Sequence, residues 1–271
     1  MITPLPLAYR RRRTYVPQVK TRYVQCSWLL VLLVAPACGS SDSLRTDFTP
    51  TNRGDVVTFG DAFTGGFFHL GPVDYEETQY HNACAPGTKY PSKIRQIEGD
   101  MLTALWDGIP KVAYYCDSCI WVETEKGRSA LLRVVSYGDT TRNSIDVSPN
   151  AYDLLNTGEN PRNMQWWFSK CPDTGPLLYE FKPESSQWWA AFWIRDTRIA
   201  IAKVEISGPN HKDFVTLRRE TDGSSVDDSG FGKGDFTIRL TSIDGQQLSD
   251  TFTWPDSGIG GVTLTGQGNF Q

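Results

Sequence analysis

Three tryptophans lie within one short segment, "SSQWWAAFWIRD", which covers residues 185–196. Trp188 and Trp189 are adjacent, and Trp193 follows four residues later. Because neighbouring side chains of a β-strand point to opposite faces, a regular strand here would expose one ring of the adjacent pair to water. An exposed indole can stack on a flat apolar ligand surface, and covering a ring face of about 100 Å² gains roughly 2.5 kcal/mol. Core packing is the alternative, and it accounts for most tryptophans.

The residues that most often hold metals or phosphates do not form a site pattern. The three histidines, His69, His81 and His211, lack the spacing of metal ligands, and none accompanies a nucleophile motif. The glycine-rich run "GFGKGD", residues 230–235, stands between two predicted strands and has no helix after it, so it indicates a hairpin turn rather than a phosphate loop. We therefore expect neither a metal ion nor a cofactor.

The first 37 residues differ in composition from the rest of the chain. They carry six basic residues and no acidic one, and a short apolar run follows, "SWLLVLLVAPAC", which ends at Cys38. This pattern is typical of a secretory signal peptide, and the run is too short to span a bilayer. Cys38 stands in a setting that resembles the lipidation site of bacterial lipoproteins, and ordinary cleavage near Ala37 is the alternative. The polar residues 38–55 are expected to form a flexible tether.

Besides Cys38, four cysteines follow the signal peptide: Cys84, Cys116, Cys119 and Cys171. Their number and the "CDSC" spacing would suit a zinc site with four thiolate ligands. An exported chain folds in an oxidising environment, and this favours two disulfides instead. The spacing does not select among the three possible pairings.

The charge of the exported chain limits its partners. Without residues 1–37 it has 21 basic and 31 acidic side chains, a net charge near −10. Such a chain is repelled by nucleic acid and by polyanionic wall polymers, whereas a neutral polymer is not excluded. Contact with a membrane is expected only through a lipid on Cys38.

The elements that must position these residues are mainly β-strands. From Val56 onward, short β-type runs alternate with turn residues. Two stretches have a helical pattern instead: residues 98–106, "EGDMLTALW", and residues 148–156, where Ser148 can cap a helix that Pro149 begins. After "CPDTGP", residues 171–176, a second series of strands covers roughly 95 residues, a length and spacing typical of a small β-sandwich.

Several segments resemble those of bacterial expansins. They are "SIDVSPNAYDLL", residues 144–155, then "WWFSKCPDTGPLLYEFKPESSQWWAAFWIRD", residues 166–196, and "IRLTSIDGQQLSDTF" with "DSGIGG" near the end. The resemblance covers residues 57–271. It implies an all-β fold in which a six-stranded double-psi β-barrel, residues 56–174, precedes an immunoglobulin-like β-sandwich, residues 175–271, that acts as a carbohydrate-binding module.

The resemblance also assigns roles to the aromatic segment. Trp188 and Trp189 match the family's two binding tryptophans, and Lys182 matches a basic residue beside them. The family's third aromatic position falls on Asp222, so the stacking surface is expected to be shorter by one ring. Trp193 lies on the same strand face as Trp189 by spacing, so it either extends this surface or packs in the core.

In the barrel, the resemblance places Asp146 at the family's key acid and Tyr137 at its tyrosine. The family's earlier aspartate falls on Val135, or on Ser136 with one gap, although Asp139 is close enough to stand in for it. Thr64 is a weaker match to a threonine of the groove. Since hydrolysis with inversion needs two carboxyl groups that flank the bond, one acid without its partner argues against it.

The leading hypothesis is therefore a monomeric, exported protein that binds cellulose or another neutral wall glucan and loosens plant-type walls without hydrolysis. It would remain in the cell envelope through Cys38 or be secreted. A wall enzyme is the second hypothesis, either an endoglucanase or a lytic transglycosylase that acts on peptidoglycan with one carboxyl group. The third is a carbohydrate-binding protein whose groove is degenerate.

Overall fold

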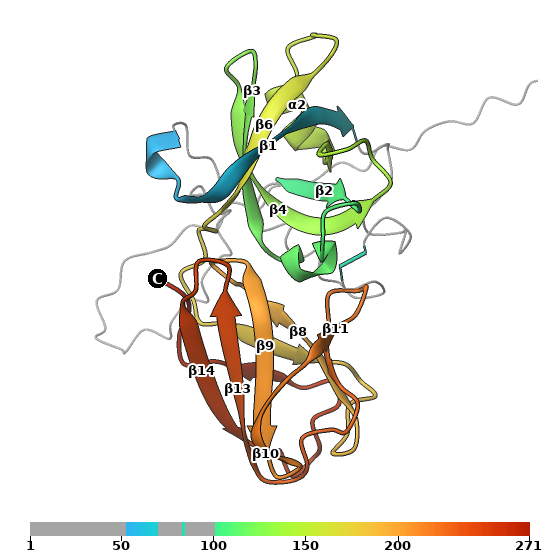
Figure 1. The fold of residues 1–271 in the computed structure, drawn as a ribbon, viewed down its shortest axis with the longest axis vertical. Coiled ribbons are helices and arrows are strands. Elements are labelled where there is room, and N and C mark those ends of the chain that lie inside the picture. Colours follow the sequence, from blue (N-terminus) through green and yellow to red (C-terminus); the bar gives the residue numbers. More distant parts are fainter. Residues whose placement is uncertain (1–52, 70–82, 85–100) are drawn as a thin grey trace, which may run out of the picture. The chain divides into compact units, whose positions relative to one another are not determined.

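The structure is a computed structural model that describes residues 53–69, 83–84 and 101–271 (Figure 1). The predicted signal peptide, Cys38 and most of the predicted tether lie outside the described residues. The described part of the chain begins with a 3-10 turn, Arg53–Asp55, and Arg53 stacks with its guanidinium carbon 4.0 Å from the ring centroid of Trp167. No helix in these ranges is long and apolar enough to cross a membrane.

The first six strands close into a barrel, with the order β1-β5-β2-β4-β3-β6. Two neighbouring pairs, β1 with β5 and β2 with β4, are parallel, and the other pairs are antiparallel. The strands are β1 (Thr58–His69), β2 (Leu102–Trp106), β3 (Cys119–Thr124), β4 (Ser129–Gly138), β5 (Ile145–Val147) and β6 (Asn163–Ser169).

The barrel buries side chains on both sides of β3 and β6. Ile120, Val122 and Trp166 belong to the barrel core, whereas Trp121 and Trp167 form a second cluster with the cystine sulfurs of Cys119 and Cys171. Because these strands have apolar neighbours on both faces, their sequences read as continuous apolar runs rather than as an alternation.

The rest of the chain forms two sheets that pack face to face. One has the strand order β10-β9-β13-β14 and the other β11-β12-β8-β7-β15. The first sheet contains β9 (Ile201–Gly208), β10 (His211–Thr216), β13 (Asp235–Ser242) and β14 (Gln247–Thr253); the second contains β7 (Leu178–Phe181), β8 (Ala190–Arg195), β11 (Arg218–Arg219), β12 (Ser225–Asp227) and β15 (Thr263–Thr265).

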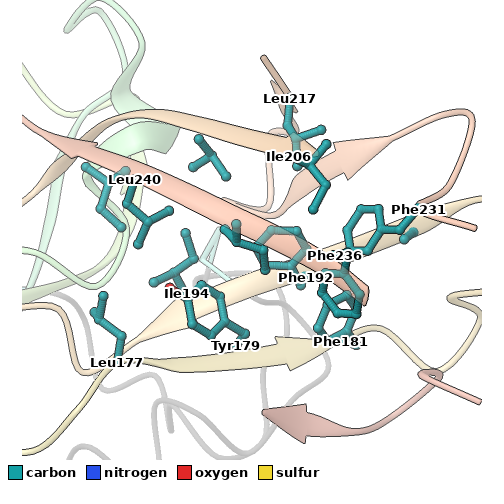
Figure 2. Close-up of a cluster of buried hydrophobic side chains, with 14 of the residues drawn as sticks. Leu177, Tyr179, Phe181, Phe192, Ile194, Ile206, Leu217, Phe231, Phe236 and Leu240 are labelled. Atoms are coloured by element: carbon teal, nitrogen blue, oxygen red, sulfur yellow. The ribbon is translucent and has the colours of Figure 1, made fainter. Parts of the chain in front are cut away.

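Aromatic and branched side chains fill the space between the two sheets. Figure 2 shows Phe181 and Phe192 of one sheet close to Phe236 of the other, with Phe231 beside them. The period of two is strict on β8: Phe192 and Ile194 belong to this core and Trp193 does not, so Trp193 lies on the outer face. The six-stranded barrel and the sandwich confirm the predicted all-β class.

One of the two predicted helices is correct. Helix α2 (Pro149–Leu155) begins at Pro149, and Ser148 is its N-cap residue. Ser148 makes no capping hydrogen bond with its side chain; its hydroxyl accepts a hydrogen bond from the backbone N–H of Leu102, at 3.2 Å.

The other predicted helix, residues 98–106, is wrong where the structure describes it. Leu102–Trp106 is strand β2, which lies between β4 and β5 with Leu102 and Leu105 fully buried. A short, wholly buried strand is an apolar run that periodicity cannot distinguish from a buried helix, and pairing with two neighbours decides its conformation.

The cysteines form the two predicted disulfides. Cys84 bonds to Cys116, and Cys119 bonds to Cys171. The second disulfide follows from the barrel topology, because Cys119 is the register partner of Ser169 on β6, two residues before Cys171. The two cysteines of "CDSC" therefore serve different bonds. In the described ranges, no three His, Cys, Asp or Glu side chains gather as metal ligands.

Candidate functional site

Trp188 stands in a tight turn directly before β8. Ser186 and Trp189 pair as an isolated β-bridge, in which the backbone N–H of Ser186 donates to the carbonyl of Trp189 at 2.7 Å. The backbone N–H of Trp188 donates to the Ser186 hydroxyl at 3.3 Å. Trp188 is 68% exposed, more than any other large hydrophobic residue in the described ranges. It is therefore a turn, rather than the expected regular strand, that presents this ring to solvent.

Trp189 is half-buried, and an ion pair lies beside it. Asp228 accepts two hydrogen bonds from the Arg218 guanidinium, at 2.7 and 2.8 Å. The Arg218 hydrogen bonds lower the pKa of Asp228 most, and the nearby Trp189 side chain lowers it further. The carboxylate therefore remains charged beside the second indole.

Trp193 lies further along the outer face of β8 and is covered. It is 7% exposed, and its indole N–H donates to the backbone carbonyl of Asp222 at 3.0 Å. The ammonium of Lys182 lies 5.1 Å from the Trp193 ring centroid and 2.5 Å from a carboxylate oxygen of Asp222. Trp193 does not offer an open stacking face, because the Lys182–Asp222 ion pair and the backbone carbonyl of Asp222 cover the ring.

Asp222 is the residue on which the family's third aromatic position was predicted to fall. Burial raises its pKa, but hydrogen bonds from Lys182 and from Ser224 outweigh burial and hold the pKa below its usual range. The position thus contributes a charged, paired carboxylate beside the rings instead of another ring.

Asp146, the acid that the resemblance predicted as the key one of the barrel, is half-buried. It lies on β5 between the buried residues Ile145 and Val147, and its register partners are Phe68 of β1 and Ala104 of β2. One carboxylate oxygen accepts a hydrogen bond from the Thr140 hydroxyl at 3.2 Å. Burial raises the pKa of Asp146, the Thr140 hydrogen bond partly opposes this, and the charge of Asp139 raises the pKa further.

The other predicted barrel residues lie at different distances from Asp146. Asp139 is exposed and close enough to repel the Asp146 charge. Tyr137 is half-buried, and its hydroxyl donates to the backbone carbonyl of Thr221. Thr64 is exposed on β1, four positions before Phe68, so about 13 Å of extended strand separates it from the level of Asp146.

The two positions that could have held the family's earlier aspartate have structural roles. Val135 is fully buried, and its carbonyl accepts a hydrogen bond from the backbone N–H of Cys84. The hydroxyl of Ser136 accepts one from the backbone N–H of Ala83 at 3.0 Å. Both residues therefore anchor the described residues 83–84 to β4.

Sequence reasoning missed Asp107, which follows β2. Its backbone N–H donates to the carbonyl of Gly138 at 2.7 Å, and its charge contributes to the raised pKa of Tyr137, after burial and the charge of Asp222. The sequence analysis did not single out Asp107 because the residues before it were predicted to form a helix. A prediction of strand there would have placed Asp107 at the end of a barrel strand.

Comparison with known proteins identifies the family. The chain is 31% identical to expansin YoaJ of Bacillus subtilis (strain 168) over 210 residues, which cover 76% of this chain and 81% of that protein. The chain belongs to the expansin family. It is also 31% identical over 108 residues to expansin-like protein 6 of Dictyostelium discoideum, although that match covers only 38% of this chain and 37% of the relative. No protein-family model matches the chain.

Solved expansin structures share the fold. The apo crystal structure of the Clavibacter michiganensis expansin matches with a TM-score of 0.61 at 18% identity, and the match covers 78% of this chain and 98% of that one. A crystal structure of a mutant of that expansin in complex with cellohexaose matches with a TM-score of 0.60 at 18% identity and with the same coverage. These matches confirm the barrel-plus-sandwich fold, and the sequence match to the Bacillus protein confirms the predicted family.

Proposed function

We propose that this expansin binds cellulose or a related neutral glucan through Trp188 and Trp189 and loosens plant-type walls without cleaving a bond. The observation that carries the proposal is the 68% exposure of Trp188 in a hydrogen-bonded turn next to the half-buried Trp189. The axial C–H bonds of a glucan chain form a flat apolar surface that suits such rings. That a related expansin was crystallised with cellohexaose supports this substrate class.

The surface is polar around the rings. Lys182 and Asp222 form an ion pair over Trp193, and Arg218 with Asp228 borders Trp189. Such groups can hydrogen-bond sugar hydroxyls at the edge of a stacked chain. The acidic charge of the whole chain disfavours polyanionic ligands. We therefore assign a neutral polysaccharide to this surface.

The barrel would hold a neighbouring glucan chain at Asp146, which hydrogen-bonds its hydroxyls. Loosening would then follow when these contacts replace hydrogen bonds between glucan chains. The absence of carboxyl groups at Val135 and Ser136 supports a non-hydrolytic role, because neither can act as the second acid or base.

A wall enzyme is the second candidate, and the environment of Asp146 favours it specifically. Burial raises the pKa of this carboxyl, which is the property of a general acid. A lytic transglycosylase that acts on peptidoglycan needs only one such group. Incubation with purified sacculi tests this candidate: anhydro-sugar products that disappear in Asp146→Asn would support it.

A pure binding protein is the third candidate. It predicts normal retention on cellulose, no weakening of walls, and no effect of Asp146→Asn. The non-hydrolytic proposal predicts instead that wild type weakens wall specimens and that Asp146→Asn weakens them less, with retention unchanged. In all cases, the double change of Trp188 and Trp189 to Ala should abolish retention on microcrystalline cellulose; unchanged retention would discard the stacking surface.

We also propose that the protein acts outside the cytoplasm as a monomer, either anchored through Cys38 or released after cleavage near Ala37. The basic, apolar leader and the two disulfides support export, because disulfides persist in oxidising compartments. The mass of the mature N-terminal peptide distinguishes the two forms: a diacylglyceryl group on Cys38 indicates an anchor, and an unmodified terminus indicates secretion.

A further inference from the structure

Loop 229–232, about forty residues later in the chain, packs closely against the turn that carries Trp188, residues 186–189. The backbone N–H of Gly232 donates to the carbonyl of Gln187 at 3.1 Å. Gly230 approaches the turn so closely that a Cβ atom there would lie 2.4 Å from the Gln187 oxygen and 2.6 Å from the Trp188 carbonyl carbon. Its φ of +65° also favours glycine. Loop 229–232 therefore forms a close-fitting support under the turn.

Asn210 joins the turn to this loop. It lies in the connection between β9 and β10, and its side-chain amide donates to three backbone carbonyls: Gln187 at 3.2 Å, Ser229 at 3.1 Å and Gly230 at 3.0 Å. An amide has two N–H groups, so the three acceptors share them. One side chain of the β9–β10 connection thus holds both the turn before β8 and the loop that supports it.

The same loop is also held from its other side. The carboxylate of Asp227 accepts the backbone N–H of Ser229 at 2.9 Å, and its second oxygen lies 2.7 Å from Nε2 of His211. The backbone N–H of Asn210 donates to the carbonyl of Phe231, whose ring belongs to the sandwich core. The support of the turn is therefore continuous with the core.

We propose that Asn210 is a positioning residue for Trp188, an inference that rests on the proposed binding of glucan by this ring. Trp188 is mostly exposed, so its own packing contributes little to fixing the ring. The backbone of the turn determines the position of the indole, and the hydrogen bonds of Asn210 determine the position of that backbone. A free turn would have to be ordered when a glucan chain binds, and ordering one such side chain costs roughly three- to ten-fold in affinity.

The test is Asn210→Asp in the full mature protein. The new carboxylate has nearly the same shape but no N–H group to donate, and it faces three carbonyl oxygens. The matched control is Asn269→Asp, which removes a similar anchor elsewhere in the sandwich, where the Asn269 amide donates to the carbonyls of Gly175 and Asp196 at 3.0 and 2.7 Å. We expect Asn210→Asp to weaken retention on microcrystalline cellulose about three- to ten-fold, and Asn269→Asp to leave it within two-fold of wild type.

A second readout needs no sugar. In protein labelled with 5-fluorotryptophan, the ¹⁹F resonance of Trp188 is identified by its loss in Trp188→Phe. We expect Asn210→Asp to shift or broaden this resonance, and Asn269→Asp to leave it unchanged. If wild type does not bind cellulose, the proposed function fails while this resonance still tests the positioning role. An unchanged Trp188 resonance and unchanged retention in Asn210→Asp would overturn the inference.

Two further comparisons separate positioning from general stability. In a Trp188→Ala background, Asn210→Asp should change retention less than two-fold, because the residue acts through that ring. If Asn210→Asp does not fold, Gly230→Ala serves instead, since its Cβ displaces the same turn. Equal loss of retention in Asn210→Asp and Asn269→Asp, or an undiminished effect without Trp188, would show that Asn210 supports only the fold.

Discussion

The change Trp188→Ala separates binding from folding most cleanly. Trp188 is 68% exposed, so its removal opens no cavity, and the free energy of unfolding should stay within about 0.5 kcal/mol of wild type. Stacking on a glucan chain covers one ring face of about 100 Å², which is worth about 2.5 kcal/mol at 25 cal/mol per Å². This corresponds to an affinity for cellulose about 60-fold lower.

The neighbouring tryptophans supply an internal ranking. Trp189 is half-buried, so part of its face is already covered and Trp189→Ala should lower affinity less than Trp188→Ala. Trp193 is 7% exposed beneath Lys182 and Asp222, so Trp193→Ala should cost about 3–5 kcal/mol of stability.

The assay is a depletion isotherm on microcrystalline cellulose, combined with denaturant unfolding of each variant. Phe214→Ala is the control, because Phe214 is also exposed but lies on β10 of the other sheet. Retention of Trp188→Ala within two-fold of wild type would refute the stacking argument, as would an equal loss in Phe214→Ala.

Two further predictions concern stability. Burial raises the pKa of Asp117 to about 7, although Arg133 and Arg195 oppose this. Because this pKa lies above the unfolded value near 3.8, the stabilising contribution of the protonated carboxyl is complete below pH 3.8. It is lost as the pH rises to 7, which lowers the free energy of unfolding by at most about 4 kcal/mol. Asp117→Asn should flatten the pH dependence of the unfolding free energy between pH 4 and 7, and identical slopes in both proteins would contradict the assignment. The disulfides close loops with sequence separations of 32 and 52 residues, so replacing either pair by serine should cost about 4 kcal/mol; a loss below about 1 kcal/mol in denaturant unfolding would contradict this.

The sequence predicted the aromatic segment but not the way in which it is presented. The run "SSQWWA" has no Gly, Pro, Asn or Asp, and its two serines are only a weak turn signal. The turn depends on Asn210 and Gly230, which are distant in sequence and come close only in the folded sandwich. For the same reason, the sequence could not predict that Trp188 is exposed and Trp193 is buried.

In the barrel, too, some features could be predicted from the sequence and others could not. The all-β class, the two series of strands and helix α2 followed from alternation and capping residues. Strand β2 was taken for a helix, and this hid Asp107 at its end. The disulfide pairing was equally inaccessible, because it depends on the register of β3 against β6 rather than on the spacing of cysteines.

The most direct measurement follows mechanical strength and bond cleavage together. Wild-type protein is added to cellulose paper, and the tensile strength and the reducing ends are measured in the same samples over time. We expect the tensile strength to fall while the reducing ends stay at the level of the blank. A rise in reducing ends in proportion to the loss of strength would contradict it.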